Sequence, residues 1–304
     1  MKKSGFIAII GRPNAGKSTL LNTVLDSELS IVTPKAQTTR ERVTGILTQP
    51  QGQMVFVDTP GIHKARSGGF NSFMVSEAKE ALDSPDLIWY LVDPGSALQH
   101  EQAVIDLLKG NTSPLVLLLT KSDRVDRVPA LEAALIEALQ AAGVQPVKVL
   151  SISARSGNGI QELMELSWDK LPEGPAFYPD ETQISDRPVR FFVAEKIREQ
   201  VFLKLGEEIP YSCAIQIEKY DEKAVPPRIE AYIHVERESQ KGMVIGQGGK
   251  KIKEIGTAAR EQIEAFLGNK VFLGLQVKVL TEWSRDPELM KRLGYVLPKK
   301  GKAS

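Results

Sequence analysis

Hydrophobic residues in the first 170 positions fall into short continuous runs separated by helical patterns. The runs at 6–10, 54–57, 87–93, 115–119 and 147–150 each have the length of a buried strand. Helical spacing begins at 18–22 and recurs at 99–109 and 131–142. Strands that alternate with helices predict an α/β fold, with a parallel, doubly wound sheet and a ligand site at the strand ends.

The pattern changes in the second half of the chain. Residues 173–188 are rich in proline and charge and lack periodicity, which predicts a linker. Beyond them the pattern predicts a helix at 189–206, strands at 211–219 and 228–237, a helix ending near residue 267 and a strand at 271–280. We therefore expect two domains, residues 1–172 and 189–304, the second of α+β type.

Composition restricts the class of protein. The 304 residues are 42% hydrophobic and 25% charged, as in ordinary globular domains. A single cysteine, Cys213, excludes an internal disulfide, and no apolar run is long enough to span a membrane, so we expect a cytoplasmic protein. Residues 1–182 carry 17 basic and 21 acidic side chains, whereas 183–304 carry 22 and 17. An anionic partner is therefore expected at the second half.

The sequence GRPNAGKS follows the first predicted strand and opens the first predicted helix. This pattern is the phosphate-binding loop, in which backbone N–H groups and a helix N-terminus bind anionic oxygens. Lys17 is expected to reach the terminal phosphates, and Ser18 to ligate Mg²⁺. The expected phosphate-binding residues are Gly11, Arg12, Pro13, Asn14, Ala15, Gly16, Lys17, Ser18 and Thr19.

Two later segments are expected to complete the phosphate site. The irregular stretch 30–42 contains Thr38 and Thr39, either of which could order around a γ-phosphate and Mg²⁺. The third segment, Asp58-Thr59-Pro60-Gly61, follows a predicted strand, so Asp58 could hold the Mg²⁺ shell and Gly61 could donate its N–H to the γ-phosphate. We assign Ser18, Thr39 and Asp58 to the metal, with Thr38 as the alternative to Thr39.

A base-recognition site is expected after the strand at 115–119. Thr120-Lys121-Ser122-Asp123 follows it directly, and the Asp123 carboxylate can accept bonds from guanine N1–H and the N2 amino group. Adenine lacks that donor pair, so it would leave the carboxylate unpaired. Lys121 is expected along the base, and Ser153, Ala154 and Arg155 could close over the guanine carbonyl.

The motifs GRPNAGKS, TTR, DTPG, TKSD and SAR, in this order, resemble those of the translation-factor-related GTPases. Two positions depart from better-known members. Thr120 stands where many GTPases have asparagine, so a side-chain connection between this loop and the phosphate loop is in doubt. Ile62 stands where Ras-like enzymes have the water-orienting glutamine, so the catalytic group must come from elsewhere.

In the second domain, Gly246-Gln247-Gly248-Gly249 matches the GXXG loop with which KH domains clamp a nucleic-acid backbone. Lys250, Lys251 and Lys253 supply positive charge beside it. A bare GXXG also fits a helix cap with a flexible turn. The flanking Val-Ile and Lys-Ile residues and the element order resemble a type II KH domain.

A GTPase domain followed by such a KH domain closely resembles the Era family of bacterial GTPases, over nearly the entire chain. The resemblance implies a monomer that binds and hydrolyses GTP to GDP, recognises 16S rRNA near its 3′ end and acts in small (30S) ribosomal subunit assembly. It also implies peripheral association with the inner membrane.

Catalysis is assigned by the same resemblance to Lys17, Asn14 and Gly61. In related GTPases an asparagine at the position of Asn14 helps to coordinate K⁺ in place of an arginine finger, which implies K⁺ beside Mg²⁺. Two alternatives stay open here. Because Ile62 cannot orient a water, one alternative is an RNA-binding protein that does not hydrolyse its bound nucleotide. The other is an ATP-dependent enzyme, against which Asp123 argues.

Overall fold

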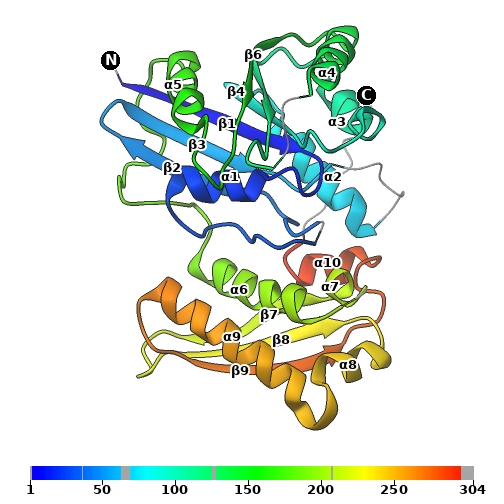
Figure 1. The fold of residues 1–304 in the computed structure, drawn as a ribbon. Helices are drawn as coiled ribbons and strands as arrows, with labels where there is room; N and C mark the ends of the chain where they lie inside the picture. Colours follow the sequence, from blue (N-terminus) through cyan, green and yellow to red (C-terminus); the bar gives the residue numbers. More distant parts are fainter. Residues whose placement is uncertain (1, 36, 63–68, 125–127, 207, 296–304) are drawn as a thin grey trace. The chain divides into compact units, whose positions relative to one another are not determined.

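The computed structural model describes residues 2–35, 37–62, 69–124, 128–206 and 208–295 (Figure 1). The chain divides into two compact units. One comprises residues 1–66 and 74–186, and the other comprises residues 67–73 and 187–304. No described helix is both long enough and apolar enough to cross a bilayer.

The first unit is built on a six-stranded sheet with the strand order β2-β3-β1-β4-β5-β6. Its strands are β1 (Lys3–Gly11), β2 (Val43–Gln49), β3 (Gly52–Asp58), β4 (Leu87–Val92), β5 (Leu115–Leu119) and β6 (Pro146–Ser151). All adjacent pairs are parallel except β2–β3, which is antiparallel. The expectation of a wholly parallel sheet was therefore wrong at one edge, because β2 and β3 are joined by a tight turn rather than a crossover helix.

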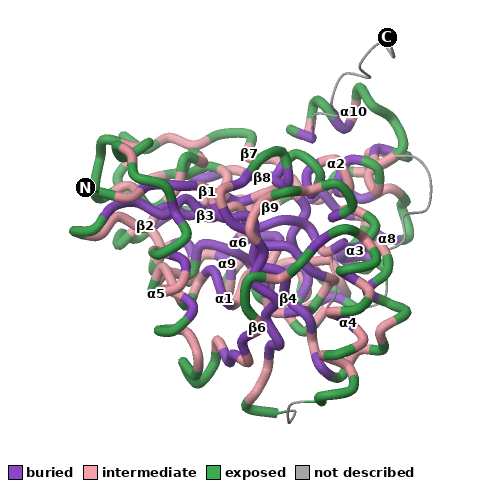
Figure 2. Tube along the Cα trace, turned by 90° about the horizontal axis from the view of Figure 1, so that it is seen from above, coloured by how far each residue is buried: buried purple, intermediate pink, exposed green. Residues whose placement is uncertain are grey.

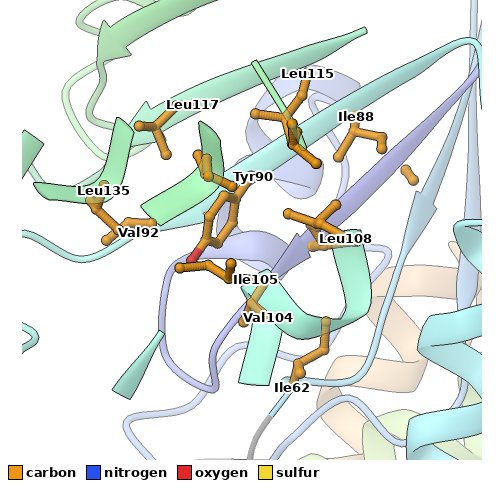
Figure 3. Packing of buried hydrophobic residues seen from close by; sticks show 14 of the residues in the cluster. Ile62, Ile88, Tyr90, Val92, Val104, Ile105, Leu108, Leu115, Leu117 and Leu135 are labelled. Carbon is orange, nitrogen blue, oxygen red and sulfur yellow. The ribbon is translucent and has the colours of Figure 1, made fainter. Parts of the chain in front are cut away.

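Helices cover both faces of this sheet. They are α1 (Lys17–Leu25), α2 (Gly69–Ala81, of which residues 74–81 belong to this unit), α3 (Gln102–Leu108, preceded by the 3-10 helix η1, Leu98–His100), α4 (Pro129–Ala141) and α5 (Ile160–Lys170). On one face, α3 and α4 pack on alternate residues of β4 and β5, such as Tyr90 and Leu117 (Figure 3). On the other, the Trp89 indole donates to Ser167 of α5 at 3.1 Å. Strands β1, β3 and β4 are buried along most of their length (Figure 2).

The second unit has the helix, two strands, two helices and strand of the predicted order, together with two short helices, Ile209–Ser212 and Pro287–Arg292, that were not predicted. The first of these occupies the start of the strand predicted at 211–219, which begins instead at Ala214. Its elements are α6 (Val189–Lys204), α7 (Ile209–Ser212), β7 (Ala214–Asp221), β8 (Arg228–Val235), α8 (Glu238–Ile245), η2 (Gln247–Gly249), α9 (Lys250–Leu267), β9 (Phe272–Val279) and α10 (Pro287–Arg292). Strand β8 pairs antiparallel with β7 and parallel with β9. Its alternate residues Ile229, Ala231 and Ile233 pack against α6 and α9 in one hydrophobic core.

The segment 173–186 groups with the first unit and is bonded to its sheet. Along edge strand β2, the Ile46 N–H donates to the Ile184 carbonyl at 2.9 Å. The Gln53 amide exchanges two hydrogen bonds with the Tyr178 backbone, at 3.0 and 2.9 Å. The Ile46 bond satisfies a backbone donor of an otherwise open sheet edge, and the Gln53 bonds hold the segment beside the neighbouring strand β3. Lack of periodicity alone could not indicate either contact.

Candidate nucleotide site and nucleic-acid interface

The predicted phosphate loop connects β1 to α1 and lines a cavity of about 450 Å³. That volume is typical of a small-ligand site. Of the residues predicted to bind nucleotide, the cavity is lined by Pro13, Asn14, Gly16, Lys17, Ser18, Thr19, Thr38, Thr39, Gly61 and Lys121. Segments far apart in the sequence therefore meet at one hollow beside the strand ends.

Lys17 is buried within its own loop. Its Nζ donates to the carbonyls of Gly11 and Arg12, at 3.1 and 2.9 Å. Burial lowers the pKa of Lys17 to about 8, while the negative charges of Asp58 and Glu101 oppose that shift. The ammonium is thus held by two carbonyl oxygens at the base of the phosphate loop.

The three residues assigned to the metal meet in the structure. The Ser18 hydroxyl donates to Asp58 Oδ2 at 2.8 Å and lies 2.9 Å from the Thr39 hydroxyl. Asp58 is fully buried, and its other oxygen, Oδ1, has no hydrogen-bond partner among the described residues. Burial raises the pKa of Asp58, against the opposing Lys17 charge and the Ser18 hydrogen bond. Hydroxyl and carboxylate oxygens with one unpartnered atom fit a hard cation such as Mg²⁺.

The Asp58–Gly61 segment is pressed against the phosphate loop. A Cβ atom on Gly61 would lie only 2.6 Å from Pro13 Cα, so a side chain there would push the two segments apart. The Thr59 hydroxyl donates to the Ile9 carbonyl at 2.8 Å, which fixes the segment on β1. Ile62 is 3% exposed and points into the hydrophobic core beside Val104 (Figure 3). Its side chain is therefore directed away from the cavity and cannot orient a water there.

The residues predicted to recognise the base come together from two loops. Ser153 donates to Asp123 Oδ1 at 2.7 Å, and this hydrogen bond lowers the pKa of the Asp123 carboxyl. Asp123 is exposed, and its second oxygen, Oδ2, lies 3.7 Å from Arg124 Nε, so a ligand at that oxygen would meet the guanidinium as well. Lys121 forms a 2.6 Å ion pair with Asp93. Ala154 is tied to α1, since its carbonyl accepts from Thr23 at 3.1 Å, and Arg155 is exposed.

Thr120 does form a side-chain connection to the phosphate loop, contrary to the doubt raised from the sequence. Its hydroxyl donates to the Ala15 carbonyl at 2.9 Å and lies 3.2 Å from the Val92 carbonyl. The shorter side chain reaches because β5 ends beside β4 and the phosphate loop follows the adjacent β1. Thr120 therefore connects the base loop to the phosphate loop.

In the second unit, the GXXG loop lies between α8 and α9, as predicted. Gly246 has φ 70°, and a Cβ atom there would lie 2.6 Å from Lys251 Cβ, so the turn requires glycine. Gln247, Gly248, Lys250 and Lys253 are exposed. Lys251 is instead paired with Glu254 of the same helix, at 2.9 Å. The loop thus presents its backbone and two exposed lysines, Lys250 and Lys253, to which an anionic chain could bind.

Sequence reasoning did not identify several residues that the structure places at the nucleotide cavity. Residues 31–34 line it, although no motif distinguishes them from other loop residues. Asp93 pairs with Lys121, and buried Glu101 lies beside Arg12, 3.8 Å away. These contacts depend on the turn after β4, and nothing in its local sequence indicates them.

Comparison with known proteins assigns families to both units. The family described as 50S ribosome-binding GTPase matches residues 6–121, and the KH domain family matches residues 208–284. The chain is 44% identical to GTPase Era of Geobacter sp. (strain M21) over 297 residues, which cover 96% of this chain and 98% of that protein.

Two solved structures are similar over almost the full length. One is Era in complex with MgGDPNP and nucleotides 1506–1542 of 16S ribosomal RNA, at TM-score 0.90 and 34% identity, covering 98% of this chain and 100% of that chain. The other is a variant of Aquifex aeolicus Era bound to GDP and AlF4−, at TM-score 0.89 and 35% identity, covering 97% of this chain and 100% of that chain.

Proposed function

This chain belongs to the Era family of GTPases, and on that basis we propose a GTP-hydrolysing switch that binds 16S rRNA near its 3′ end in 30S subunit assembly. The observation that carries the proposal is the meeting of Ser18, Thr39 and Asp58 beside the phosphate loop. Three separate motifs of one GTPase family converge there, in a chain that also holds a KH domain.

A turnover assay tests the enzymatic part directly. Phosphate release is measured with GTP in large excess over protein, with and without unlabelled ATP. We expect repeated turnover of GTP, no competition by ATP, and loss of both binding and release in Lys17→Ala. Bound GTP without release would leave the nucleotide a structural ligand, and effective competition by ATP would contradict guanine recognition.

For the metal, we propose Ser18, Thr39 and Asp58 as the residues that hold Mg²⁺, directly or through its water. When bound, Mg²⁺ neutralises phosphate charge. Thr39 is 8% exposed and adjoins Ser18, which favours it over Thr38. Thr39→Ala should remove the Mg²⁺-dependent gain in affinity for a non-hydrolysable GTP analogue, whereas Thr38→Ala should retain it. The reverse pattern would assign the metal to Thr38.

Guanine recognition is proposed for Asp123, with Ser153 orienting the carboxylate and Lys121 along the base. In this arrangement the ionised oxygen that Ser153 does not bond accepts the guanine donors. The backbone of Ser153, Ala154 and Arg155 would close over the carbonyl of the base, and Thr120 would hold the whole loop against Ala15.

Stabilisation of the reacting phosphate is proposed for Lys17, the Gly61 N–H and a K⁺ ion held with the help of Asn14. Asn14 has φ 63° and lines the same cavity as Lys17, and its amide donates to the Pro34 carbonyl at 3.3 Å. Amide and carbonyl oxygens suit a hard monovalent cation. Turnover should be faster in K⁺ than in Na⁺ at equal ionic strength, and equal rates would contradict this assignment.

For RNA, we propose that the backbone of Gly246 to Gly249 contacts the nucleotide chain, with Lys250, Lys251 and Lys253 meeting phosphates. The resemblance further implies a monomer in the cytoplasm that associates peripherally with the inner membrane. Light scattering of the purified protein tests the first of these expectations, and co-sedimentation with vesicles of inner-membrane lipids tests the second.

A further inference from the structure

A buried carboxylate lies behind the phosphate loop, and the roles assigned above do not use it. Glu101 lies between η1 and α3, and its side chain is 1% exposed. Its Oε2 accepts a hydrogen bond from the Tyr90 hydroxyl at 2.9 Å, and its Oε1 accepts one from the Ser96 hydroxyl at 3.3 Å. A buried charge is costly unless it is paired and hydrogen-bonded, so these partners call for a physical explanation.

The positive partner of this carboxylate is in the phosphate loop itself. Arg12 Nη1 lies 3.8 Å from Glu101 Oε1 and donates to Ser96 at 2.5 Å. The Arg12 carbonyl, in turn, accepts from Lys17 Nζ. A continuous path of polar contacts therefore runs from Glu101 through Arg12 to the phosphate-binding lysine.

The other side of the carboxylate is fixed by the hydrophobic core. The Tyr90 ring lies in the cluster with Val92, Ile105 and Leu117 (Figure 3), so its hydroxyl has little freedom to move. Burial raises the pKa of Glu101, whereas the Tyr90 hydrogen bond and the Arg12 charge favour its ionised form. Glu101 is thus anchored in the rigid sheet and directed toward a loop that must keep its shape.

We propose that Glu101 is a positioning residue for phosphate binding, which acts through Arg12 and Ser96 to hold the carbonyls of the phosphate loop that anchor Lys17. It touches no phosphate itself. Without its charge, Arg12 would lose its buried partner, and the Gly11–Arg12 backbone would sample other conformations. Nucleotide affinity then falls because binding must first reorder the loop. The inference rests on the proposed nucleotide site and adds a residue to it.

Two substitutions at Glu101 separate charge from shape. Glu101→Gln keeps the size and removes the charge, whereas Glu101→Asp keeps the charge and removes one methylene from a packed site. If Glu101 acts through its charge on Arg12, Glu101→Gln should weaken GDP and GTP-analogue binding about 5- to 20-fold, with Glu101→Asp less affected. A role in packing alone predicts the opposite order.

Kinetics and a mutant cycle give independent readouts. Glu101→Gln should raise KM with kcat changed less than about threefold, since bound nucleotide restores the loop. Combining it with Arg12→Gln should weaken binding no more than the stronger single change. Simple addition of the two effects, or binding by Glu101→Gln within about twofold of wild type, would overturn the proposal.

Two further variants provide a control and a second test of the proposal. Glu77→Gln removes another buried carboxylate of the first unit, one that pairs with Arg42, and should leave nucleotide affinity unchanged. Ser96→Ala removes the bridging hydroxyl from a half-buried turn and should weaken binding even if Glu101→Gln fails to fold. Unchanged affinity in Ser96→Ala would also count against the proposal. A wild-type protein that binds no guanine nucleotide would instead refute the proposed function.

Discussion

At the scale of single residues, the nucleotide site shows how a neighbour determines what a side chain can do. Thr120 reaches the Ala15 carbonyl at 2.9 Å, so a short hydroxyl joins two loops. Asp123 has one oxygen bonded by Ser153, whereas the other faces Arg124 at 3.7 Å on the exposed side of the loop. The residue type indicates which interactions a side chain can form, and these contacts determine which of those interactions it does form.

Replacing Asp123 with asparagine should exchange guanine preference for xanthine preference. The amide presents donors to guanine donors, and leaving such groups unpaired costs about 1–3 kcal/mol, or roughly 5- to 150-fold in affinity. Competition binding with GTP and xanthosine triphosphate measures the exchange. Asp106→Asn, an exposed change on α3, serves as the control, and unchanged GTP affinity in Asp123→Asn would rule out the base contact.

His234 gives a pH-dependent prediction in the second unit. Burial, with the Lys278 and Arg292 charges, lowers the pKa of His234 from 6.5 to about 4. The unfolded chain therefore binds more protons between pH 4 and 6.5, so stability is fully present above pH 6.5 and falls as pH drops through this window. The loss at pH 4 should be roughly 1–3 kcal/mol.

Denaturant titrations of wild type and His234→Gln at pH 7 and pH 4.5 measure this loss. The variant retains a polar group near Gln216 but has no group that titrates in this range. Its stability should therefore fall less than that of wild type between the two pH values. Equal losses in both proteins would show that His234 does not titrate as predicted.

At the scale of elements, the GXXG turn depends on the two helices that it joins. Gly246 approaches Lys251 so closely that the turn has no room for a side chain, and the loop is therefore held with its backbone exposed. Lys251 is paired with Glu254, whereas Lys250 and Lys253 are exposed. The exposed pair should therefore carry most of the electrostatic contact with RNA.

Replacing Gln247 and Gly248 with aspartate should abolish RNA binding, because two negative charges and added bulk meet the phosphate backbone. GTP affinity should stay within about twofold, since distant sites are nearly independent. Binding to a 16S rRNA 3′ fragment is measured over a range of salt concentrations. Asn269→Asp with Gln276→Glu adds the same charge elsewhere in the second unit, and an equal loss in this control would contradict a specific role for the loop.

A milder change tests the lysines of the same element. Neutralising Lys250 or Lys253 should lower the slope of log affinity against log salt by roughly one for each lost phosphate contact. Lys251→Gln should change it less, because its charge is already compensated by Glu254. Equal slopes for all three variants and wild type would exclude these lysines from phosphate contact.

At the scale of the whole molecule, two units with separate cores hold the two proposed binding sites in one chain. A switch requires more than their presence, because each ligand must alter the affinity for the other. Coupling between binding sites is reciprocal, so if GTP tightens RNA binding, RNA must tighten GTP binding by the same factor.

Measuring GTP-analogue affinity with and without the rRNA fragment therefore tests the switch. We expect a gain of about 5- to 150-fold, the usual range of coupling between two sites. The Gln247→Asp, Gly248→Asp variant should show no gain, because it cannot bind the fragment. Identical affinities for wild type in both conditions would leave an RNA-binding GTPase without a switch.

The sequence by itself determined the features that depend on neighbouring residues, namely the buried strands and the glycine-containing loops. Continuous apolar runs identified five strands. Four of them, β1, β3, β4 and β5, are buried along most of their length, and a strand buried on both faces must be apolar throughout. The GRPNAGKS and GQGG loops were located because phosphate and backbone binding need small residues at fixed spacing. The order of the elements then indicated both the GTPase fold and the KH fold, since each family has its motifs in a fixed order along the chain.

Features that depend on contacts between residues distant in the sequence were decided only by the tertiary structure. Strand β2 and the helices α2 and α5 were not predicted from the sequence. The segment 173–186 lacks any period, yet it is bonded to the sheet edge. Glu101 looks like a surface residue in sequence and becomes a buried anchor because the turn after β4 brings it beside Arg12. Arg12 and Glu101 are 89 positions apart, and they meet only because the sheet folds, so local residue spacing cannot predict their contact.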